Sequence, residues 1–140
     1  ESDIDTALWF DNQPLSVNRD HTLRFAFKNK NPKNKFKIER FEIELPDGMR
    51  FSDQGCDKFE NGVLMETYFA SINNALNNEV EGESFGSCRV RVDDNILGGS
   101  SADIVKAGDV NAVMQYEYTI VAERDVTLRQ PEEDQIKAEV

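Results

Sequence analysis

Hydrophobic and polar residues alternate with a period of two along several segments of the chain, a pattern typical of β-strands with one buried face. Residues 22–28 carry leucine or phenylalanine at every second position, with mostly polar residues between them. The clearest alternation runs over residues 114–122 and continues more weakly to Leu128. A straight strand over residues 113–129 would be about 56 Å long at roughly 3.3 Å per residue. We therefore expect the chain to bend near residues 123–125.

A second strand, with one irregularity, is predicted after the first. Phe36 and Ile38 share one face, and the alternation resumes out of phase at Phe41. A slip of one residue inside a strand indicates a β-bulge, here at residues 39–40. The intervening residues 29–34 contain three asparagines and a proline, which favour turns. The pattern predicts a β-hairpin.

The remaining segments are shorter, and one of them is helical in its spacing. Residues 62–76 repeat apolar side chains at a helical interval, which predicts an amphipathic helix. Asparagines near its end are weak helix formers, so we expect fraying there, and a β-strand over residues 63–70 is the alternative. Short strands are predicted at residues 6–10, 49–51, 87–92 and 102–106.

These elements together predict a mainly β fold: an Ig-like antiparallel β-sandwich of about seven strands with at most one short helix, around residues 62–76. A length of 140 residues fits a single domain. We assign residues 1–129 to this β-sandwich domain and residues 130–140, which are polar and acidic, to a tail or linker. No apolar run approaches about 18 residues, so we expect no membrane span in this chain. The acidic start without Met suggests a processed chain or a fragment, which leaves a removed signal or anchor open.

The formal net charge of −11 disfavours binding to nucleic acid and to anionic membranes. The exception is a basic patch within residues 21–40, which hold seven basic residues and one acidic residue. This patch could contact an acidic protein partner, including a copy of the same chain. The alternative is that its lysines only keep the edge of a sheet soluble. The lysines of the patch are Lys28, Lys30, Lys33, Lys35 and Lys37.

The two cysteines, Cys56 and Cys88, form no CxxC motif, and one histidine cannot complete a conventional zinc site. A disulfide between them would contribute roughly 3 to 4 kcal/mol on the chain-entropy model. It would also indicate an oxidising compartment, such as the cell exterior. The alternative is two unrelated buried thiols in a cytosolic protein.

The chain contains no recognisable nucleophile–base pair for catalysis. His21 is the only histidine, and the chain has no Gly-x-Ser-x-Gly motif, so we expect no enzymatic activity. No cofactor is predicted, although calcium could bind at a loop end. An EF-hand is excluded because Ile104 occupies the position that requires glutamate. The carboxylates available to such a calcium site, with plain polar turns as the alternative, are Asp93, Asp94, Asp103 and Asp109.

Aromatic side chains could form a platform for polysaccharide. Tyr116 and Tyr118 share a face with Met114, so core packing explains them, and we expect Trp9 to lie in the core as well. The five candidates are Trp9, Phe10, Tyr68, Tyr116 and Tyr118.

One pattern in the chain has known counterparts. It consists of residues 22–32, followed by residues 36–45 and by Pro46-Asp47-Gly48. It resembles the opening hairpin of Ig-like extracellular β-sandwich domains of prokaryotic surface proteins, including archaeal pilin-like and archaellum-associated proteins. The resemblance covers about 30 residues, and it implies an architecture and a location at the cell surface.

We therefore expect a non-enzymatic structural or interaction module, extracellular or at the cell surface, within a filament, envelope layer or adhesin. It would mediate protein–protein contacts, including contacts with copies of itself, through a strand edge or the basic patch. The alternative is a polysaccharide-binding accessory module, with or without calcium.

Overall fold

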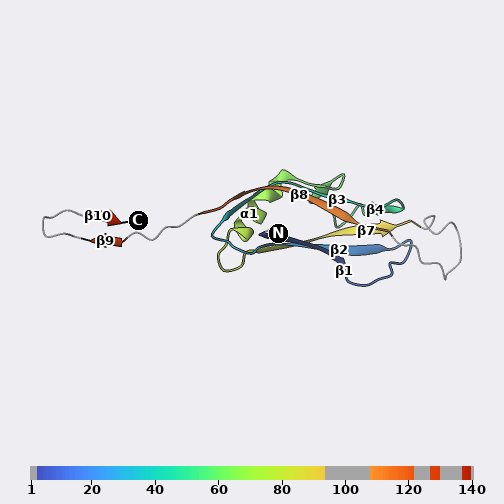
Figure 1. The fold of residues 1–140 in the computed structure, drawn as a ribbon. Helices are drawn as coiled ribbons and strands as arrows, with labels where there is room; N and C mark the ends of the chain where they lie inside the picture. Colours follow the sequence, from blue (N-terminus) through green and yellow to red (C-terminus); the bar gives the residue numbers. More distant parts are fainter. Residues whose placement is uncertain (1–2, 94–107, 122–126, 130–136, 140) are drawn as a thin grey trace.

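In the computed structural model, the chain forms two antiparallel four-stranded sheets that pack face to face (Figure 1). The structure describes residues 3–93, 108–121, 127–129 and 137–139. The predicted mainly β sandwich with one short helix is confirmed, with eight strands in the two sheets. Within the part of the chain that the structure describes, no helix has both the length and the apolar character needed to cross a membrane.

The first sheet contains the two strands that alternation predicted around residues 25 and 90. The buried side chains of β2 and β7 come from every second position, as the sequence pattern requires. In spatial order its strands are β1 (Ile4–Phe10), β2 (Asp20–Asn29), β7 (Glu83–Val92) and β4 (Met49–Phe51).

The second sheet is built around the long strand β3, which is irregular at the predicted place. Its pairing with β8 shifts register between Ile38 and Arg40, which confirms the predicted β-bulge. In spatial order its strands are β5 (Phe59–Glu60), β6 (Val63–Leu64), β3 (Lys35–Glu44) and β8 (Asn111–Thr119).

The predicted hairpin of β2 with β3 is wrong, because the two strands belong to opposite sheets. β2 pairs with β1 and β7, whereas β3 pairs with β6 and β8. The connection crosses between the sheets, and buried Asn29 holds it in place. The side-chain amide of Asn29 donates to the carbonyl oxygens of Leu76 at 3.0 Å and Asn34 at 3.3 Å, and it accepts from the backbone of Asn31 at 3.1 Å. We call residues 30–34 the arch.

The helical segment is shorter than the predicted span of residues 62–76. A 3₁₀ turn, η1 (Glu66–Tyr68), leads into helix α1 (Phe69–Leu76), while Val63 and Leu64 form strand β6. The turn before β6 places Asn61 and Gly62 at positive φ, a conformation that no helix contains. Ile72 and Leu76 face the core, so the helical spacing was correct from there on.

The core between the sheets is rich in phenylalanine. The rings of Phe27 and Phe41 pack edge to face with centroids 4.8 Å apart, and Phe25 and Phe59 do so at 5.7 Å. Such pairs add favourable ring electrostatics to the burial of large apolar surfaces. These contacts join β2 in the first sheet to β3 and β5 in the second.

Two further strands, β9 (Thr127–Arg129) and β10 (Lys137–Glu139), pair only with each other among the described residues. In Figure 1 they lie beyond the end of β8 and apart from the two sheets. β10 falls within the segment expected to be a tail or linker. The predicted strand at residues 102–106 and the predicted bend at residues 123–125 lie outside the described residues.

Candidate interaction surface

One side of the sandwich is closed by helix α1, whose asparagines act as a substitute strand. Phe36 of β3 donates its backbone N–H to Oδ1 of Asn77 at 2.7 Å, and Nδ2 of Asn77 donates to the carbonyl of Phe36 at 2.9 Å. The N–H of Ile38 donates to Oδ1 of Asn73 at 2.8 Å. The helix therefore covers the part of the β3 edge that β6 does not reach. The sequence indicates only that these asparagines are weak helix formers, so this role was not predicted.

The opposite side of the sandwich holds two edge strands, β1 and β8. At the closed side, the ring of Phe51 in β4 lies against Gly62 at the start of β6. Since β4 and β6 face each other, the far edges of the two sheets, β1 and β8, lie together on the other side. Within the described residues, no strand pairs with β1 beyond β2, or with β8 beyond β3. We call this side of the molecule the open side.

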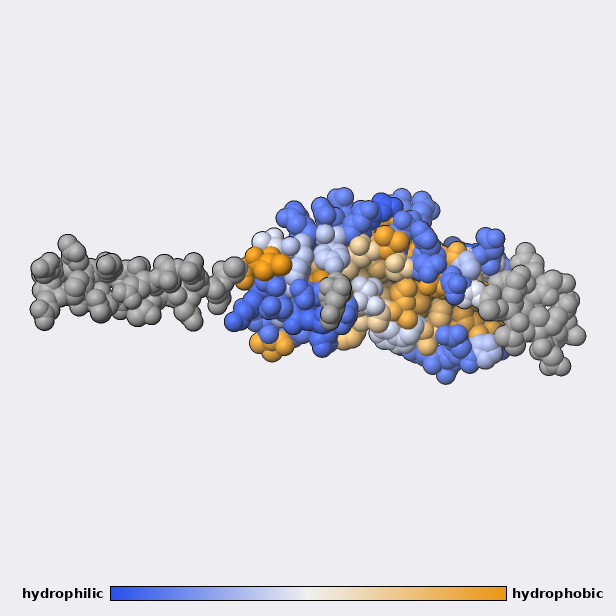
Figure 2. All heavy atoms as spheres, viewed as in Figure 1, coloured by the Kyte–Doolittle hydropathy of each residue, from blue (hydrophilic) through white to orange (hydrophobic). Residues whose placement is uncertain are grey.

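Apolar side chains line the inner faces of these two edge strands. Leu8 and Phe10 of β1, and Ala112 and Met114 of β8, are only partly buried, although they pack against the core. Figure 2 shows the corresponding apolar strip between two polar rims. We call these four residues the apolar strip. An edge strand with an uncovered apolar face is a site at which another chain can add a strand.

The outer face of the first sheet displays two aromatic side chains. Trp9 is 39% exposed and Phe85 is 69% exposed, so the prediction of Trp9 as a core residue is wrong. Trp9 lies one position from inward-facing Leu8, so the pleat directs it outward. Phe85 was missed, although the alternation of β7 places it on the same face as Arg89.

The other aromatic candidates face the interior, as expected for Tyr116 and Tyr118. The ring of Tyr116 lies 5.4 Å from that of Phe36, and the hydroxyl of Tyr118 donates to Oδ1 of Asn29 at 3.0 Å. Tyr68 lies beside α1, where Nζ of Lys58 is 5.4 Å from its ring centroid.

The five lysines of the predicted interaction patch lie at one end of the sandwich but on different faces. Lys28 points outward from the first sheet, whereas Lys35 and Lys37 point outward from the second. Lys33 is exposed in the arch. Two of the lysines are paired, Lys28 with Glu83 and Lys30 with Asp5, each at 3.5 Å. The structure therefore does not gather the lysines into one surface.

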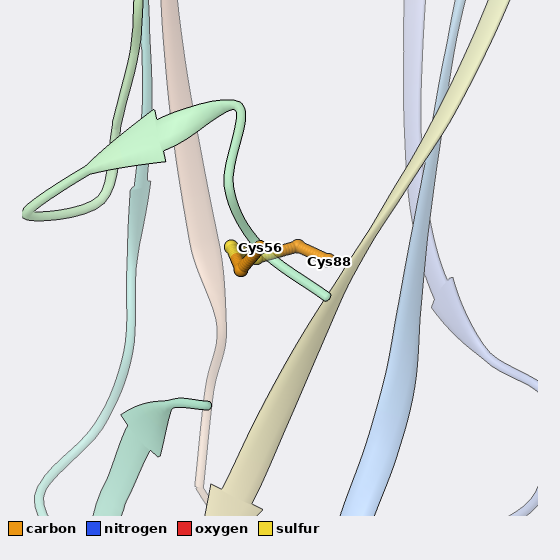
Figure 3. The surroundings of a disulfide bond; sticks show 2 residues. All are labelled: Cys56 and Cys88. Carbon is orange, nitrogen blue, oxygen red and sulfur yellow. A yellow bond between two sulfur atoms is a disulfide. The ribbon is translucent and has the colours of Figure 1, made fainter. Parts of the chain in front are cut away.

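Cys56 and Cys88 are joined by a disulfide, with Cα atoms 4.5 Å apart (Figure 3). Cys88 is an inward-facing residue of β7 with no exposed surface, and Cys56 lies in the loop that leads to β5. The bond therefore connects the first sheet to the segment that enters the second sheet. The pairing follows the sequence prediction.

The four carboxylates considered for calcium are not brought together. Asp93 pairs with Nε of Arg50 at 3.4 Å, and Asp109 is exposed at the start of the last sandwich strand. Asp94 and Asp103 lie outside the described residues. Among the residues that the structure does describe, no cluster of three or more possible metal ligands occurs.

His21 lines a small polar cavity of about 210 Å³ together with Asp11 and Asp20. Nε2 of His21 donates to the carbonyl oxygen of Ser16 at 2.7 Å. Nε of Arg24 donates to Asp11 at 2.8 Å, and this hydrogen bond lowers the pKa of Asp11. Both carboxylates are held by arginine, so the cavity presents paired charges.

Comparisons with protein-family models, with curated proteins and with solved structures found no match to this chain.

Proposed function

We propose that this protein is a non-enzymatic module of an extracellular or cell-surface assembly, such as a filament, an envelope layer or an adhesin. Its role is to make protein–protein contacts through the open side. The observation that carries the proposal is the contrast between the two sides of the sandwich. On the closed side, Asn73 and Asn77 cover the part of β3 that β6 leaves unpaired, and the edge strands β4 and β5 have only three and two residues. On the open side, the edge strands β1 and β8 have seven and nine residues, and neither has a second strand partner among the described residues.

The proposed location outside the cell is supported by the disulfide. Disulfides persist in oxidising compartments and are rare in the cytosol. In the protein isolated from its natural source, Cys56 and Cys88 should resist alkylation under denaturing conditions until a reductant is added. Immediate labelling of both cysteines, measured as intact mass, would argue for a reducing compartment and against this location.

The open side is tested by a charge placed on the free edge of β8. Val113 is 47% exposed on β8 and points away from the core, so Val113→Lys should leave the fold intact. Ser71→Lys adds the same charge on the exposed surface of α1 and serves as the matched control. We expect Val113→Lys to weaken binding to copies or partners by about tenfold, because a lysine on a strand edge opposes edge pairing. Equal binding by both variants would contradict the proposal.

A second candidate, a polysaccharide-binding module, is favoured by one observation. Trp9 and Phe85 are both exposed on the outer face of the first sheet, with Ala26 on the strand between them. Flat aromatic faces are suited to stacking against sugar rings. A glycan array with Trp9→Ala and Phe85→Ala as controls, and thermal unfolding with and without calcium, would test this candidate. Binding that both variants abolish would favour it over the first proposal.

A further inference from the structure

The chain that follows β8 has the sequence of another amphipathic strand. From residue 120 to residue 128, every second residue except Arg124 is apolar, and the intervening positions are mostly polar. Within the described residues, Ile120 is 71% exposed and Val121 is 42% exposed. Exposed apolar residues at successive positions favour association with another surface.

Val121, near the start of this segment, is held against the arch of its own copy. The N–H of Val121 donates to Oδ1 of buried Asn34 at 2.9 Å, which fixes the chain against the arch just after β8 ends. The described strands that follow, β9 and β10, lie beyond that end of the sandwich (Figure 1). Their two-stranded sheet has no other strand partner among the described residues, and an isolated hairpin is only marginally stable in water.

The segment and the β8 edge match in length and in period. β8 has nine residues, and residues 120–128 are also nine, so both span about 30 Å at roughly 3.3 Å per residue. On β8 the inward side chains include Ala112 and Met114 at alternate positions. A strand added beside β8 would direct its alternate apolar residues toward Leu8 and Phe10 of β1, which are only partly buried.

We propose that residues 120–129 of one copy add as a strand to β8 of a second copy and cover its apolar strip. This inference rests on the proposed function, because it names the partner that the open side receives. Donor and acceptor surfaces are different, so the contact is head to tail. Head-to-tail contacts extend into rings or open filaments.

Two matched variants of the full chain test the donor. Leu128→Lys places a charge on the apolar face of the segment, and Thr127→Lys places the same charge on its other face. We expect Leu128→Lys to raise the dissociation constant of self-association at least about tenfold, since burial of one leucine is worth about that factor or more. Thr127→Lys should change it by less than about threefold, as exposed substitutions usually do. Sedimentation velocity over a range of concentrations measures both.

Cross-linking between copies tests the acceptor. A copy with Val113→Cys is mixed with an isotope-labelled copy with Thr127→Cys, and disulfides between light and heavy chains are identified by mass spectrometry. Ser71→Cys replaces Val113→Cys in the control mixture. We expect mixed cross-links with Val113→Cys and none above background with Ser71→Cys.

The outcomes separate this inference from the proposed function. Equal self-association of Leu128→Lys and Thr127→Lys, or an absence of Val113→Cys cross-links in assembled protein, would overturn donation by residues 120–129 and leave the open side as a contact surface. A chain that stays monomeric at millimolar concentration would also overturn it. The proposed function would fail separately, if Val113→Lys bound copies and other partners as well as Ser71→Lys did.

Discussion

At the scale of single residues, asparagine side chains make many of the hydrogen bonds that hold the loops and strand edges in place. Asn29 ties the arch to the end of α1, Asn73 and Asn77 cover the edge of β3, and Oδ1 of Asn78 accepts from the N–H groups of Val80 and Glu81. An amide carries both donors and an acceptor, so it can replace a backbone peptide at a strand edge. No buried side-chain polar atom lacks a hydrogen-bond partner within the described residues.

The edge-covering role of Asn77 leads to a stability prediction. Asn77→Ala should lower the free energy of unfolding by about 2 kcal/mol, because it leaves the N–H and C=O of Phe36 without these partners. Asn74→Ala, at an exposed position of the same helix, should change it by less than about 0.5 kcal/mol. Urea denaturation followed by circular dichroism measures both, and an equal loss in the two variants would contradict the role.

Asp20 leads to a prediction about pH. Partial burial opposes ionisation of Asp20, but hydrogen bonds from Ser52 at 3.1 Å and Arg91 at 3.4 Å outweigh it and lower its pKa below the ordinary 3.8. A lowered pKa in the folded state stabilises the protein above the unfolded-state pKa, and that stability is lost as the pH falls through the folded value. The difference in melting temperature between wild type and Asp20→Asn should therefore be constant above about pH 5 and shrink below about pH 4. Asp47→Asn, in an exposed turn, is the control; a difference that stays constant down to pH 2 would exclude this linkage.

At the same scale, the sequence predicted well which strand side chains point into the core, but it predicted poorly which aromatic side chains are exposed. Alternation correctly placed Phe25 and Val90 in the core, because period two follows directly from the pleat. Trp9 was assigned to the core on hydrophobicity alone, although its neighbour Leu8 is the inward residue. The cover that Asn77 gives to β3 depends on a contact between positions 41 residues apart, which local patterns do not contain.

At the scale of elements, the arch and the disulfide hold the two sheets together. The arch passes the chain from the first sheet to the second, and the disulfide links β7 to the loop before β5. Both cross-connections act on strands that have no hydrogen bonds to each other. The sheets are thus coupled by covalent and polar links as well as by the phenylalanine core.

The disulfide gives a prediction at this scale. Replacing both Cys56 and Cys88 with alanine should lower the free energy of unfolding by about 3 to 4 kcal/mol, since the bond closes a loop with a sequence separation of 32. Guanidinium denaturation with and without reductant provides the comparison. The wild type should lose a similar amount on reduction and the double variant should lose none; a reductant effect in the double variant would show a different cause.

The sequence located most elements but not their partners. The strands around residues 25, 40 and 90 and the β-bulge were evident from periodicity, and α1 began later than predicted only because a turn at Gly62 precedes β6. Two strands joined by a hairpin and two strands joined by an arch show the same alternation, because in both cases each strand buries one face. The crossing between the sheets is accompanied by the burial and hydrogen bonding of Asn29, which no pattern of alternating residues reveals. The open side of the sandwich, which depends on sheet order, was likewise beyond prediction.

At the scale of the whole molecule, the net charge of −11 means that identical copies repel one another. Contacts through the apolar strip must overcome this repulsion, whereas contacts through the lysines would draw on attraction between opposite charges. Added salt shortens the range of both effects. The sign of the salt dependence therefore distinguishes the two surfaces.

We expect self-association to strengthen as sodium chloride rises from about 0.05 M to about 0.5 M, where the screening length falls well below 10 Å. Analytical ultracentrifugation at fixed protein concentration measures this change. Reversing Lys30, Lys33 and Lys35 to glutamate should alter association only through net charge, and the difference from wild type should vanish at high salt. Association that weakens with salt would instead favour the basic patch.

The position of the disulfide also determines how the molecule would respond to tension. When a force pulls on one attachment point before Cys56 and another after Cys88, the bond between these two residues withholds the segment between them from extension. A separation of 32 residues corresponds to roughly 110 Å of chain at about 3.5 Å per residue. In single-molecule force spectroscopy, each unfolding step should therefore lengthen by about that amount after reduction. Oxidised protein held at such points would therefore extend less on unfolding than reduced protein.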